Sequence, residues 1–503
     1  MTEIQEFYNG QSVFITGGTG FFGKILIEKL LRSCSKIKVI YILIRPKKGK
    51  TIHDRMSEII NLQMFEPLKQ IEPMFERKIV PLAGDIIEPN FGLASEDLEL
   101  IKKEVSIIFH AAATTRFDEK LKIALKINVD SVKTMIDICK ECKNLKSFVY
   151  VSTAFSNCIY EHVEEKVYPG PLSHEKLAEL VGVMDQLNMP KKEEIKFTKL
   201  VIGKFPNTYC FTKSIAEDLI SKSAKDLPVS IYRFSIAMAA LKEPLEGWVD
   251  ANQALNQTFI GIGLGIIRVM SAKKNTNMET VPIDFACSCL IASAWETSNV
   301  KNNKEKNLQV YNYVSGTDNP VTWNYLRDYF CTQRYNLAIN KAVYHPEVMI
   351  FESIHLFIFF HYIFHFLPAV IGDIILRILG RKPMLYKIFK KGTKLALVIR
   401  FFSNREWKFD TDNVKLLWGK LSVNDKKLFN FDITSFTWDK MISTHCNGTK
   451  KYVLGLELNE KERELGERKL RRLFYIHQVV RGIFYSTVLW ILWKIYNLLF
   501  NRL

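Results

Sequence analysis

The chain has 503 residues, of which 48% are hydrophobic and 24% are charged, with 24 glycines and 16 prolines. This composition is typical of a folded protein of two or three domains, and it excludes global disorder and a collagen-like repeat. Lysine and arginine total 70 against 53 acidic residues, so the formal net charge is +17. Such an excess indicates an anionic partner, and charge alone leaves open a phosphate-rich cofactor, lipid headgroups or nucleic acid.

The nine cysteines are scattered along the chain, and the first residues, MTEIQEFYNG, contain no apolar run of the kind found in signal peptides. We therefore expect a protein that faces the reducing cytosol. Cys139 and Cys142 form a CxxC pair, but no second pair follows at the spacing of a zinc site, and the surrounding sequence has helical periodicity. The sequence thus predicts helix residues here and no metal site.

Between residues 12 and 345 of the chain, short β-rich runs alternate with amphipathic stretches such as KILIEKLLRSC. The β-rich runs are SVFIT, KVIYILI, KIVPLAG, SIIFHAA and SFVYVST. Strand followed by helix, repeated, predicts an α/β fold: a Rossmann-type parallel sheet with helices on both faces.

The first chemical motif is SVFITGGTGFFGKILIEKL, in which Gly17, Gly20 and Gly23 directly follow a β-branched strand and open a helix. The first glycine permits a tight turn, the second lets a pyrophosphate approach the backbone, and the third lets the helix pack closely on the strand. The motif predicts a dinucleotide-binding turn, in which Phe21 is a further cofactor-binding residue.

The residue after the second strand is expected to select the cofactor, because an acidic residue there binds the ribose of NAD and a cation accepts the 2′-phosphate of NADP. This place in ILIRPKKGK is occupied by Arg45, with Lys47, Lys48 and Arg55 nearby. We predict that Arg45 and Arg55 bind NADPH, with a solvated basic loop as the alternative. Asp85 follows the third strand, where it would accept a hydrogen bond from the adenine amino group or only cap a turn.

The second motif pairs Tyr209 with Lys213 in FPNTYCFTKSIAEDL. Four residues apart on a helix, they share one face, so we expect the ammonium to lower the pKa of the phenol from its usual value near 10. Upstream, the strand FVYVST ends in Ser152 and Thr153, and active sites in parallel sheets lie at the carboxyl ends of strands. A hydroxyl that orients a carbonyl, a tyrosine that donates to its oxygen and a lysine that tunes the tyrosine form an acid-catalysis set.

These segments resemble the fatty acyl-CoA reductases of the extended short-chain dehydrogenase/reductase superfamily, over almost the whole chain. TGGTGFFG, GDI, HAAATTRFDEKL, NVDSVKTM, YVSTAF and YCFTKSIAE match in order, and so do EPLEGWVD, VPIDF, NPVTW, FSNREWKFDTDNV and LSVNDKKLFNFDITSFTWDKM. The resemblance implies NADPH-dependent reduction of a long-chain acyl-CoA to a primary alcohol through an aldehyde, with release of CoA. It adds Ile86, beside Asp85, to the cofactor-binding residues.

The resemblance also implies roles for individual side chains. Tyr209, aided by Thr153, would stabilise and protonate the developing oxyanion, and Lys213 would hold the nicotinamide ribose. Asn128 is expected either to orient the active-site helix or a water, or to cap a helix, and His110 to belong to the cofactor loop rather than to act as a base. Two departures from the family pattern leave the acyl chain length open. Phe234 follows Arg233 where the family commonly has proline, and after GWVD the family usually shows an Asn-Gly-Pro segment ending in Gly where this chain has Gln253, Ala254, Leu255 and then Gln257.

Two other functions compete with this interpretation. The same fold would serve a sterol dehydrogenase or a sugar-nucleotide epimerase, although the apolar stretches and the C-terminal segments argue against the sugar enzymes. A non-catalytic scaffold that binds lipid or another anion has no physical need for the pair Tyr209 and Lys213. We expect no nucleic-acid partner.

Two apolar stretches indicate membrane association. Residues Ser353 to Gly372 contain no Asp, Glu, Lys or Arg and would span a bilayer or form a buried or interfacial hairpin; Gly482 to Phe500 is interrupted only by Lys494. Cations follow the first stretch and precede the second, which suits a cytosolic leaflet. We expect a reductase domain at 1–345, an apolar helical segment at 346–380, a smaller, mainly helical C-terminal domain at 381–460 and a membrane tail at 466–503. The endoplasmic reticulum is the expected location and the peroxisome the alternative.

Overall fold

Segments that are distant in the sequence combine into two units in the computed structural model, which describes residues 1–250, 254–300 and 308–500. Unit 1 consists of Met1–Val249, Asn277–Val321 and Glu406–Met441. Unit 2 consists of Asp250–Thr276, Thr322–Arg405 and Ile442–Leu503. The units thus interleave along the chain, whereas the four predicted domains are consecutive ranges; the functional division into those ranges stays a prediction.

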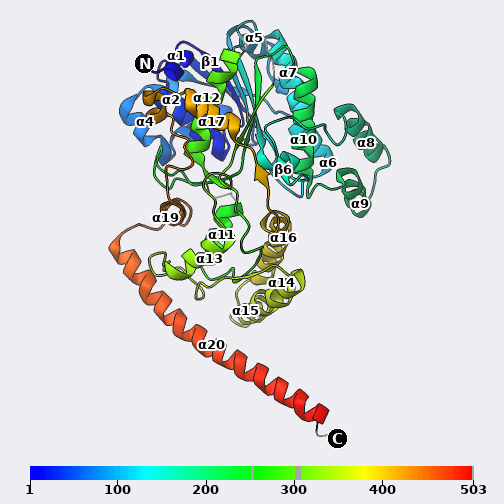
Figure 1. The fold of residues 1–503 in the computed structure, drawn as a ribbon, viewed down its shortest axis with the longest axis vertical. Helices are drawn as coiled ribbons and strands as arrows, with labels where there is room; N and C mark the ends of the chain where they lie inside the picture. The colour runs from blue at the N-terminus through cyan, green and yellow to red at the C-terminus, as the bar shows by residue number, and fades with distance from the viewer. Residues whose placement is uncertain (251–253, 301–307, 501–503) are drawn as a thin grey trace. The chain divides into compact units, whose positions relative to one another are not determined.

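A seven-stranded parallel sheet forms the centre of unit 1, in the order β11-β7-β5-β4-β1-β2-β3 (Figure 1). Its strands are β1 (Ser12–Thr16), β2 (Val39–Ile44), β3 (Ile79–Ala83), β4 (Ile107–His110), β5 (Ser147–Thr153), β7 (Val229–Phe234) and β11 (Gln309–Tyr313). Every residue of β1, β2, β4 and β5 is buried, as expected for parallel strands covered on both faces. The predicted Rossmann-type sheet is confirmed.

Helices pack on both faces of this sheet. On one face, α12 (Ile283–Val300) contacts β5 and β7, and its neighbouring helices are α1 (Glu3–Tyr8), α2 (Phe21–Ser33) and α17 (Asp412–Lys420) (Figure 1). On the other face, α10 (Thr208–Ser223) contacts β5 and α7 (Ser131–Glu141), and α7 contacts α5 (Ser95–Glu104). Cys139 lies in α7 and Cys142 caps its end, as predicted from the helical periodicity.

The order of the strands places a switch point between β1 and β4, because the chain moves from β1 toward β3 on one side and from β4 toward β11 on the other. Ligands of open parallel sheets bind outside the carboxyl ends of the strands at such a point. The loops after β1, β2, β3, β4 and β5 all leave from this edge, so the predicted site residues that follow these strands share one edge of the sheet.

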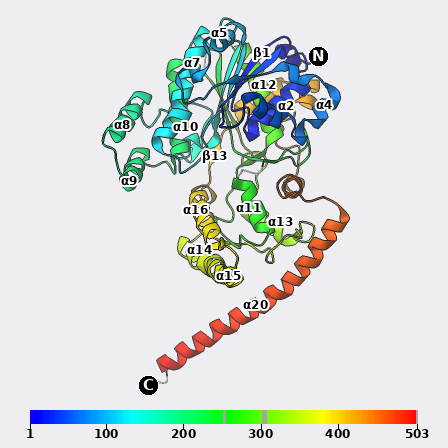
Figure 2. The same ribbon diagram turned by 180° about the vertical axis from the view of Figure 1, so that it is seen from behind.

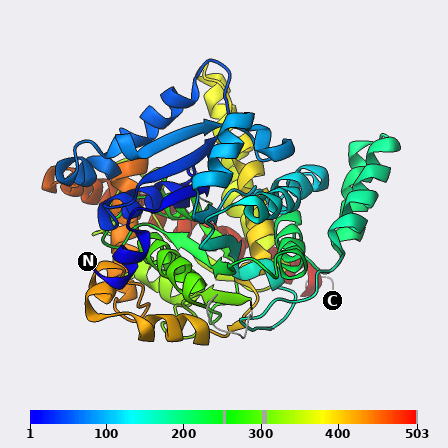
Figure 3. The same cartoon turned by 90° about the horizontal axis from the view of Figure 1, so that it is seen from above.

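Shorter elements complete unit 1. The remaining helices are α3 (Ile52–Ile60), α4 (Glu66–Ile71), α6 (Leu121–Leu125), α8 (His174–Gln186), α9 (Lys191–Ile202) and α18 (Val423–Leu428), with a π-helical turn at Lys126–Asp130. Two small parallel pairs join β6 (His162–Val163) to β13 (Lys408–Phe409) and β8 (Ile236–Met238) to β10 (Thr280–Pro282). Helices α8 and α9 project from the sheet and its covering helices (Figure 3).

Unit 2 is mainly helical (Figure 2). Its helices are α11 (Ala254–Gly263), α13 (Trp323–Thr332), α14 (Ile354–His361), α15 (Leu367–Ile378), α16 (Leu385–Ser403) and α20 (Glu460–Phe500), and β9 (Val269–Ser271) pairs with β12 (Met349–Phe351); α19 (Trp438–Gly448) begins in unit 1 and ends here. A π-helical turn joins α14 to α15. The Asp373 carboxylate then caps α16, because it accepts from the backbone N–H groups of Met384 and Leu385 at 2.8 Å.

Two helices of unit 2 have the length and apolar composition of a membrane span: Ile354–Ile378 and Glu460–Leu498. They overlap the two predicted apolar stretches over nearly their whole length, and α20 extends the second one toward the N-terminus as a single helix. Within their most apolar windows, 17% of the first helix and 0% of the second is buried.

Candidate active site

The turn between β1 and α2 is shaped by glycines. Gly17 has a φ of +78°, and a Cβ there would lie 2.7 Å from the backbone nitrogen of Ala112. At Gly23 a Cβ would lie 2.3 Å from the Gly17 carbonyl oxygen, so a side chain would push α2 away from the turn. Gly20 is the N-cap of α2 and provides no side-chain cap, which leaves the N–H groups of the first helical turn available to an anion. This cradle fits a dinucleotide pyrophosphate.

Phe21 is the first residue of α2, directly after this turn. Its side chain is buried and its ring centroid lies 5.5 Å from that of Trp248. The ring therefore packs the start of α2 against the segment that contains Trp248. The predicted role of Phe21 in cofactor binding stays a prediction.

Arg45 and Asp85 follow the neighbouring strands β2 and β3, and the structure brings them together. Arg45 Nε lies 3.8 Å from Asp85 Oδ2, and the arginine side chain is 70% exposed. Arg55, in the first turn of α3, donates from a guanidinium nitrogen to the Arg45 carbonyl oxygen and so holds this loop. Ile86 is half-buried beside Asp85. An exposed guanidinium held at the sheet edge is available to a phosphate group.

Tyr209 and Thr153 meet as predicted from the sequence. Tyr209 lies in the first turn of α10, and the N-cap Asn207 fixes this turn by accepting from Cys210 N at 2.8 Å. Thr153 ends β5, and its hydroxyl hydrogen-bonds the Tyr209 side chain. Burial raises the pKa of Tyr209 above its ordinary value, and the bond with Thr153 offsets only part of this shift.

The expected lowering of the Tyr209 pKa by Lys213 is therefore wrong in this structure. The reason is the direction of the lysine: its Nζ donates to the Val151 carbonyl oxygen at 2.7 Å and lies 4.5 Å from the centre of the Tyr150 ring. A phenol with a raised pKa stays protonated at neutral pH, which is the state a proton donor requires.

Lys213 is a buried lysine with an unusual charge environment. Burial lowers its pKa to about 7, while the negative charge of Glu217 opposes the shift. Glu217 lies one helical turn after Lys213 on α10 and is itself buried. A negative or hydrogen-bond-accepting group that a ligand brings close to this lysine would raise its pKa again.

Ser152 has its hydrogen-bond partner in Glu217 of α10. Its hydroxyl donates to Glu217 Oε1, Asn157 donates to Oε2 at 3.1 Å, and Arg233 forms an ion pair with the same carboxylate at 2.7 Å. The predicted catalytic role of Ser152 stays a prediction, since this network gives the hydroxyl a structural partner. Sequence reasoning missed Glu217 and Arg233; the available signal was the spacing of four between Lys213 and Glu217.

His110 ends β4 and is enclosed. Its Nδ1 lies 2.9 Å from Thr16 Oγ1, and its Nε2 lies 3.2 Å from Ser131 Oγ. Burial, together with the positive charge of Lys213, lowers the pKa of His110 to about 3. A histidine with both ring nitrogens engaged favours the expected cofactor-loop role over a role as base.

Asn128 connects the loop after β4 to the catalytic helix. Its Oδ1 accepts from Thr114 N at 3.0 Å, and its Nδ2 donates to Thr212 Oγ1 at 2.9 Å. Thr212 lies on α10 between Tyr209 and Lys213. Of the alternatives left open by the sequence, these contacts favour orientation of the active-site helix.

Of the two departures from the family pattern, the second includes Gln253, which lies outside the described residues, and the first has a packing partner. Phe234, at the end of β7, stacks on Phe22 of α2 with ring centroids 4.7 Å apart. A proline could not fill this space in the same way, because it lacks the aromatic ring.

A parallel sheet with a glycine turn after its first strand, and a tyrosine and lysine on a helix beside its fifth, defines a nicotinamide-dependent oxidoreductase of the short-chain dehydrogenase type. An NAD-binding family model described as male sterility protein matches residues 15–290, and a second model of that description matches residues 364–455. The chain is 36% identical over 499 residues to "Fatty acyl-CoA reductase wat" of Drosophila melanogaster, covering 98% of this chain and 94% of the relative. It is 36% identical over 459 residues to human "Fatty acyl-CoA reductase 1", covering 91% and 88%. The chain belongs to the fatty acyl-CoA reductase family.

Solved structures share the fold at lower identity. The terminal R domain from the myxalamid biosynthetic pathway aligns with a TM-score of 0.58 and 17% identity, over 89% of this chain and 92% of that domain. The reductase domain of a nonribosomal peptide synthetase from Mycobacterium tuberculosis aligns with a TM-score of 0.59 and 16% identity, over the same shares. The architecture is thus that of known reductase domains.

Proposed function

We propose that this protein reduces long-chain fatty acyl-CoA to a primary alcohol with NADPH, through an aldehyde, and releases CoA. The observation that carries the proposal is the hydrogen-bonded pair of Thr153 and Tyr209 at the sheet edge where the Gly17 turn opens, in a chain of the fatty acyl-CoA reductase family. Complete reduction of one thioester consumes two hydrides and two protons and releases one thiol.

The side chains divide the work as follows. When bound, NADPH supplies the hydride that attacks the carbonyl carbon. Tyr209 donates its phenolic proton to the carbonyl oxygen, and Thr153 orients the phenol through their hydrogen bond. Lys213, whose Nζ donates to the Val151 carbonyl oxygen near the end of β5, would hold the ribose hydroxyls of the cofactor. The hemithioacetal then passes its hydroxyl proton to the leaving thiolate and releases CoA, Tyr209 regains a proton from solvent, and the same residues protonate the aldehyde oxygen in the second reduction.

Arg45 supports the choice of NADPH over NADH. Its exposed guanidinium follows β2, where a cation accepts a 2′-phosphate and an acidic residue would bind a ribose hydroxyl. Asp85, 3.8 Å from Arg45, would hold the adenine side of the cofactor and keep the guanidinium at the sheet edge.

Membrane attachment with unit 1 facing the cytosol is part of the proposal, and the endoplasmic reticulum is its preferred location over the peroxisome. A core helix of a soluble domain is mostly buried, but the apolar windows of both candidate helices are largely exposed within the described residues. Exposed side chains on the tail include Ile483, Leu489, Trp490, Leu492 and Trp493. The charged carboxylate of Asp373, which caps α16, favours an interfacial hairpin for α15 and α16 over a membrane span. For α20 we propose a membrane span.

The test is NADPH oxidation by the full chain in detergent, with a ladder of acyl-CoAs of increasing length. We expect turnover with long-chain substrates and recovery of the alcohol and free CoA thiol in equal amounts. Sterol and UDP-sugar substrates in the same assay test the two rival enzyme classes. Turnover of one of these and none of the acyl-CoAs would overturn the proposal, and absence of any turnover would favour the scaffold.

A further inference from the structure

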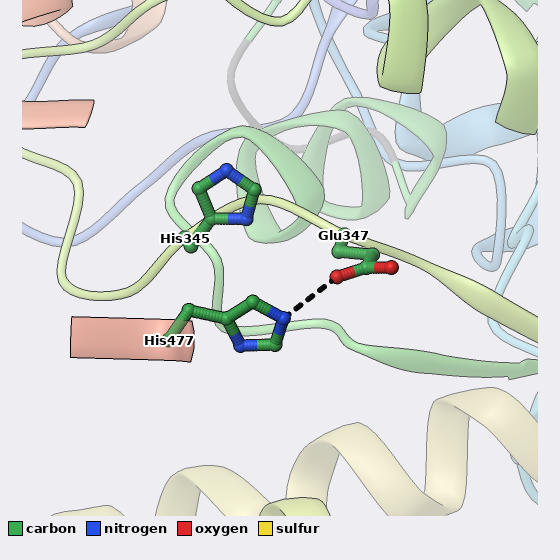
Figure 4. A group of neighbouring side chains, drawn as sticks. All are labelled: His345, Glu347 and His477. Carbon is green, nitrogen blue, oxygen red and sulfur yellow. Dashed lines mark ion pairs between the residues drawn. The ribbon is translucent and has the colours of Figure 1, made fainter. Parts of the chain in front are cut away.

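A cluster of three potential ligands lies in unit 2, whereas the residues of the candidate active site belong to unit 1. His345 and Glu347 belong to the loop before β12, and His477 lies on α20 (Figure 4). One ligand atom from each side chain lies within 4.8 Å of the other two. His477 Nε2 and Glu347 Oε2 are 2.9 Å apart, and the imidazole rings of His345 and His477 stack with centroids 5.3 Å apart.

An ion pair alone leaves part of this cluster unexplained. A protonated His477 paired with Glu347 accounts for two of the three side chains. His345 is 1% exposed, and its Nδ1 has no hydrogen-bond partner among the described residues. Figure 4 shows this ring turned toward the other two side chains. A buried ring nitrogen without a partner costs free energy unless a ligand satisfies it.

We propose that His345, Glu347 and His477 bind a zinc ion, with water in the fourth position. Two imidazoles and one carboxylate are ligands that zinc accepts, and ligand atoms around a tetrahedral zinc lie roughly 3.3 Å apart at its usual bond lengths. The pair His477 and Glu347 is already close to this separation. Adjustment of the half-buried Glu347 and of the ring angles would bring the third atom into range.

The neighbouring side chains support one ligand with a hydrogen bond and place positive charge beside another. Tyr344 Oη lies 3.1 Å from His477 Nδ1, so the phenol oxygen can accept a hydrogen bond from the N–H group that Nδ1 carries when Nε2 binds metal. Arg334 lies 3.5 Å from His345 Nε2, and Arg268 stacks on the Tyr344 ring at 4.3 Å. These cations repel a metal ion, so they lower the affinity of the site.

The position of the site suggests what the metal does. Leu470 and Leu473 of α20 are buried, whereas Ile483, Leu489 and Trp490 further along the helix are exposed. His477 lies between these parts, just before the apolar tail. A zinc ion at this point would fasten the helix to the loop before β12 and fix the position of the helix where its apolar part begins.

The experiment uses the full chain in detergent, purified without a histidine tag and freed of metal by chelation. Titration with Co²⁺, read by its visible absorption, and competition by Zn²⁺ should show one saturable site per chain. Zn²⁺ should also raise the midpoint of thermal unfolding. No saturable binding would overturn the proposal and leave only the ion pair.

Matched variants identify the ligands. Glu347→Gln is nearly isosteric at a side chain that is 39% exposed, so its loss of binding, at least tenfold, would not reflect a collapsed core. His345→Gln should lose as much, and Arg334→Gln should bind more tightly because a repelling charge is gone. His355→Gln removes an exposed histidine from the same unit and should bind like the unaltered chain. Equal affinity in Glu347→Gln and His355→Gln would contradict the assignment.

Discussion

Arg233 and Glu217 form an ion pair in which the guanidinium NH2 lies 2.7 Å from Oε2 and the side chains are 0% and 1% exposed. The same arginine donates to the backbone oxygens of Glu164 and Lys166 at 3.1 and 2.8 Å. The pair is thus buried, and its charges are satisfied by partners inside the protein. It connects α10, which holds the catalytic tyrosine and lysine, to β7 and to the loop after β6.

Removal of one partner should therefore be costly. Arg233→Met leaves a buried carboxylate without its cation, and we expect a loss of about 3–5 kcal/mol in the free energy of unfolding. Lys222→Met is the control, because Lys222 pairs with Asp218 on the same helix but is 63% exposed, and it should cost less than about 1 kcal/mol. Thermal unfolding followed by near-UV circular dichroism measures both. Similar losses in the two variants would show that the network does not hold α10.

Tyr209→Phe should abolish turnover and leave NADPH binding nearly unchanged, because the change removes one proton donor and no proposed cofactor contact. Lys213→Ala should weaken both turnover and NADPH binding. Cofactor fluorescence measures binding, and NADPH oxidation measures turnover. Tyr160→Phe removes a hydroxyl from an exposed tyrosine and should keep full activity. Retention of more than a few per cent of the activity in Tyr209→Phe would assign the proton to another acid.

Arg45→Asp should narrow or reverse the preference for NADPH over NADH, since a charge-assisted bond to the 2′-phosphate contributes roughly 1.5–3 kcal/mol. That range corresponds to a change of about 10- to 150-fold in the ratio of kcat/KM values for the two cofactors. Lys48→Asp makes the same change of charge in the same exposed loop. If both variants shift the preference equally, the charge of the loop decides and Arg45 has no specific role.

The glycine turn and the strands were predictable because each depends on local pattern, a triplet of glycines and a β-branched run. The meeting of Thr153 and Tyr209 was predictable because active sites in parallel sheets lie at the carboxyl ends of the strands, where Thr153 stands. The direction of Lys213 was not, because it depends on the Val151 carbonyl and the Tyr150 ring on a neighbouring strand. The same limit applies to His345 and His477. No spacing in the sequence brings together a loop and a helix separated by more than a hundred residues.

The lowered pKa of Lys213 predicts a dependence of stability on pH. Between about 7, its folded value, and 10.5, its ordinary value, the unfolded chain binds a proton that the folded chain does not. Stability therefore rises with pH across this window, and the cost of burying the lysine is fully present below pH 7. At 1.36 kcal/mol per pKa unit the whole effect is about 5 kcal/mol.

Thermal midpoints of the unaltered chain and of Lys213→Met, measured from pH 7 to 9.5, test this dependence. The variant should be the more stable at pH 7, and its advantage should shrink as the pH rises. Lys222→Met provides the exposed control on the same helix and should follow the unaltered chain. A constant difference between the chain and Lys213→Met across the range would contradict the lowered pKa.

The last prediction separates the two parts of α20. Gly482 to Phe500 spans about 28 Å as a helix at 1.5 Å per residue, which is close to the thickness of a hydrocarbon core. A chain that ends at Arg481 should therefore detach from membranes, yet it should stay folded and active. A chain ending at Leu465 also loses Leu470 and Leu473, which are 0% and 8% exposed, so it should additionally unfold at a lower temperature. Carbonate extraction and thermal unfolding of both chains measure the two effects. If the chain ending at Arg481 resisted extraction, the helix Ile354–Ile378 would be the anchor; if it unfolded, the apolar half of α20 would belong to a core.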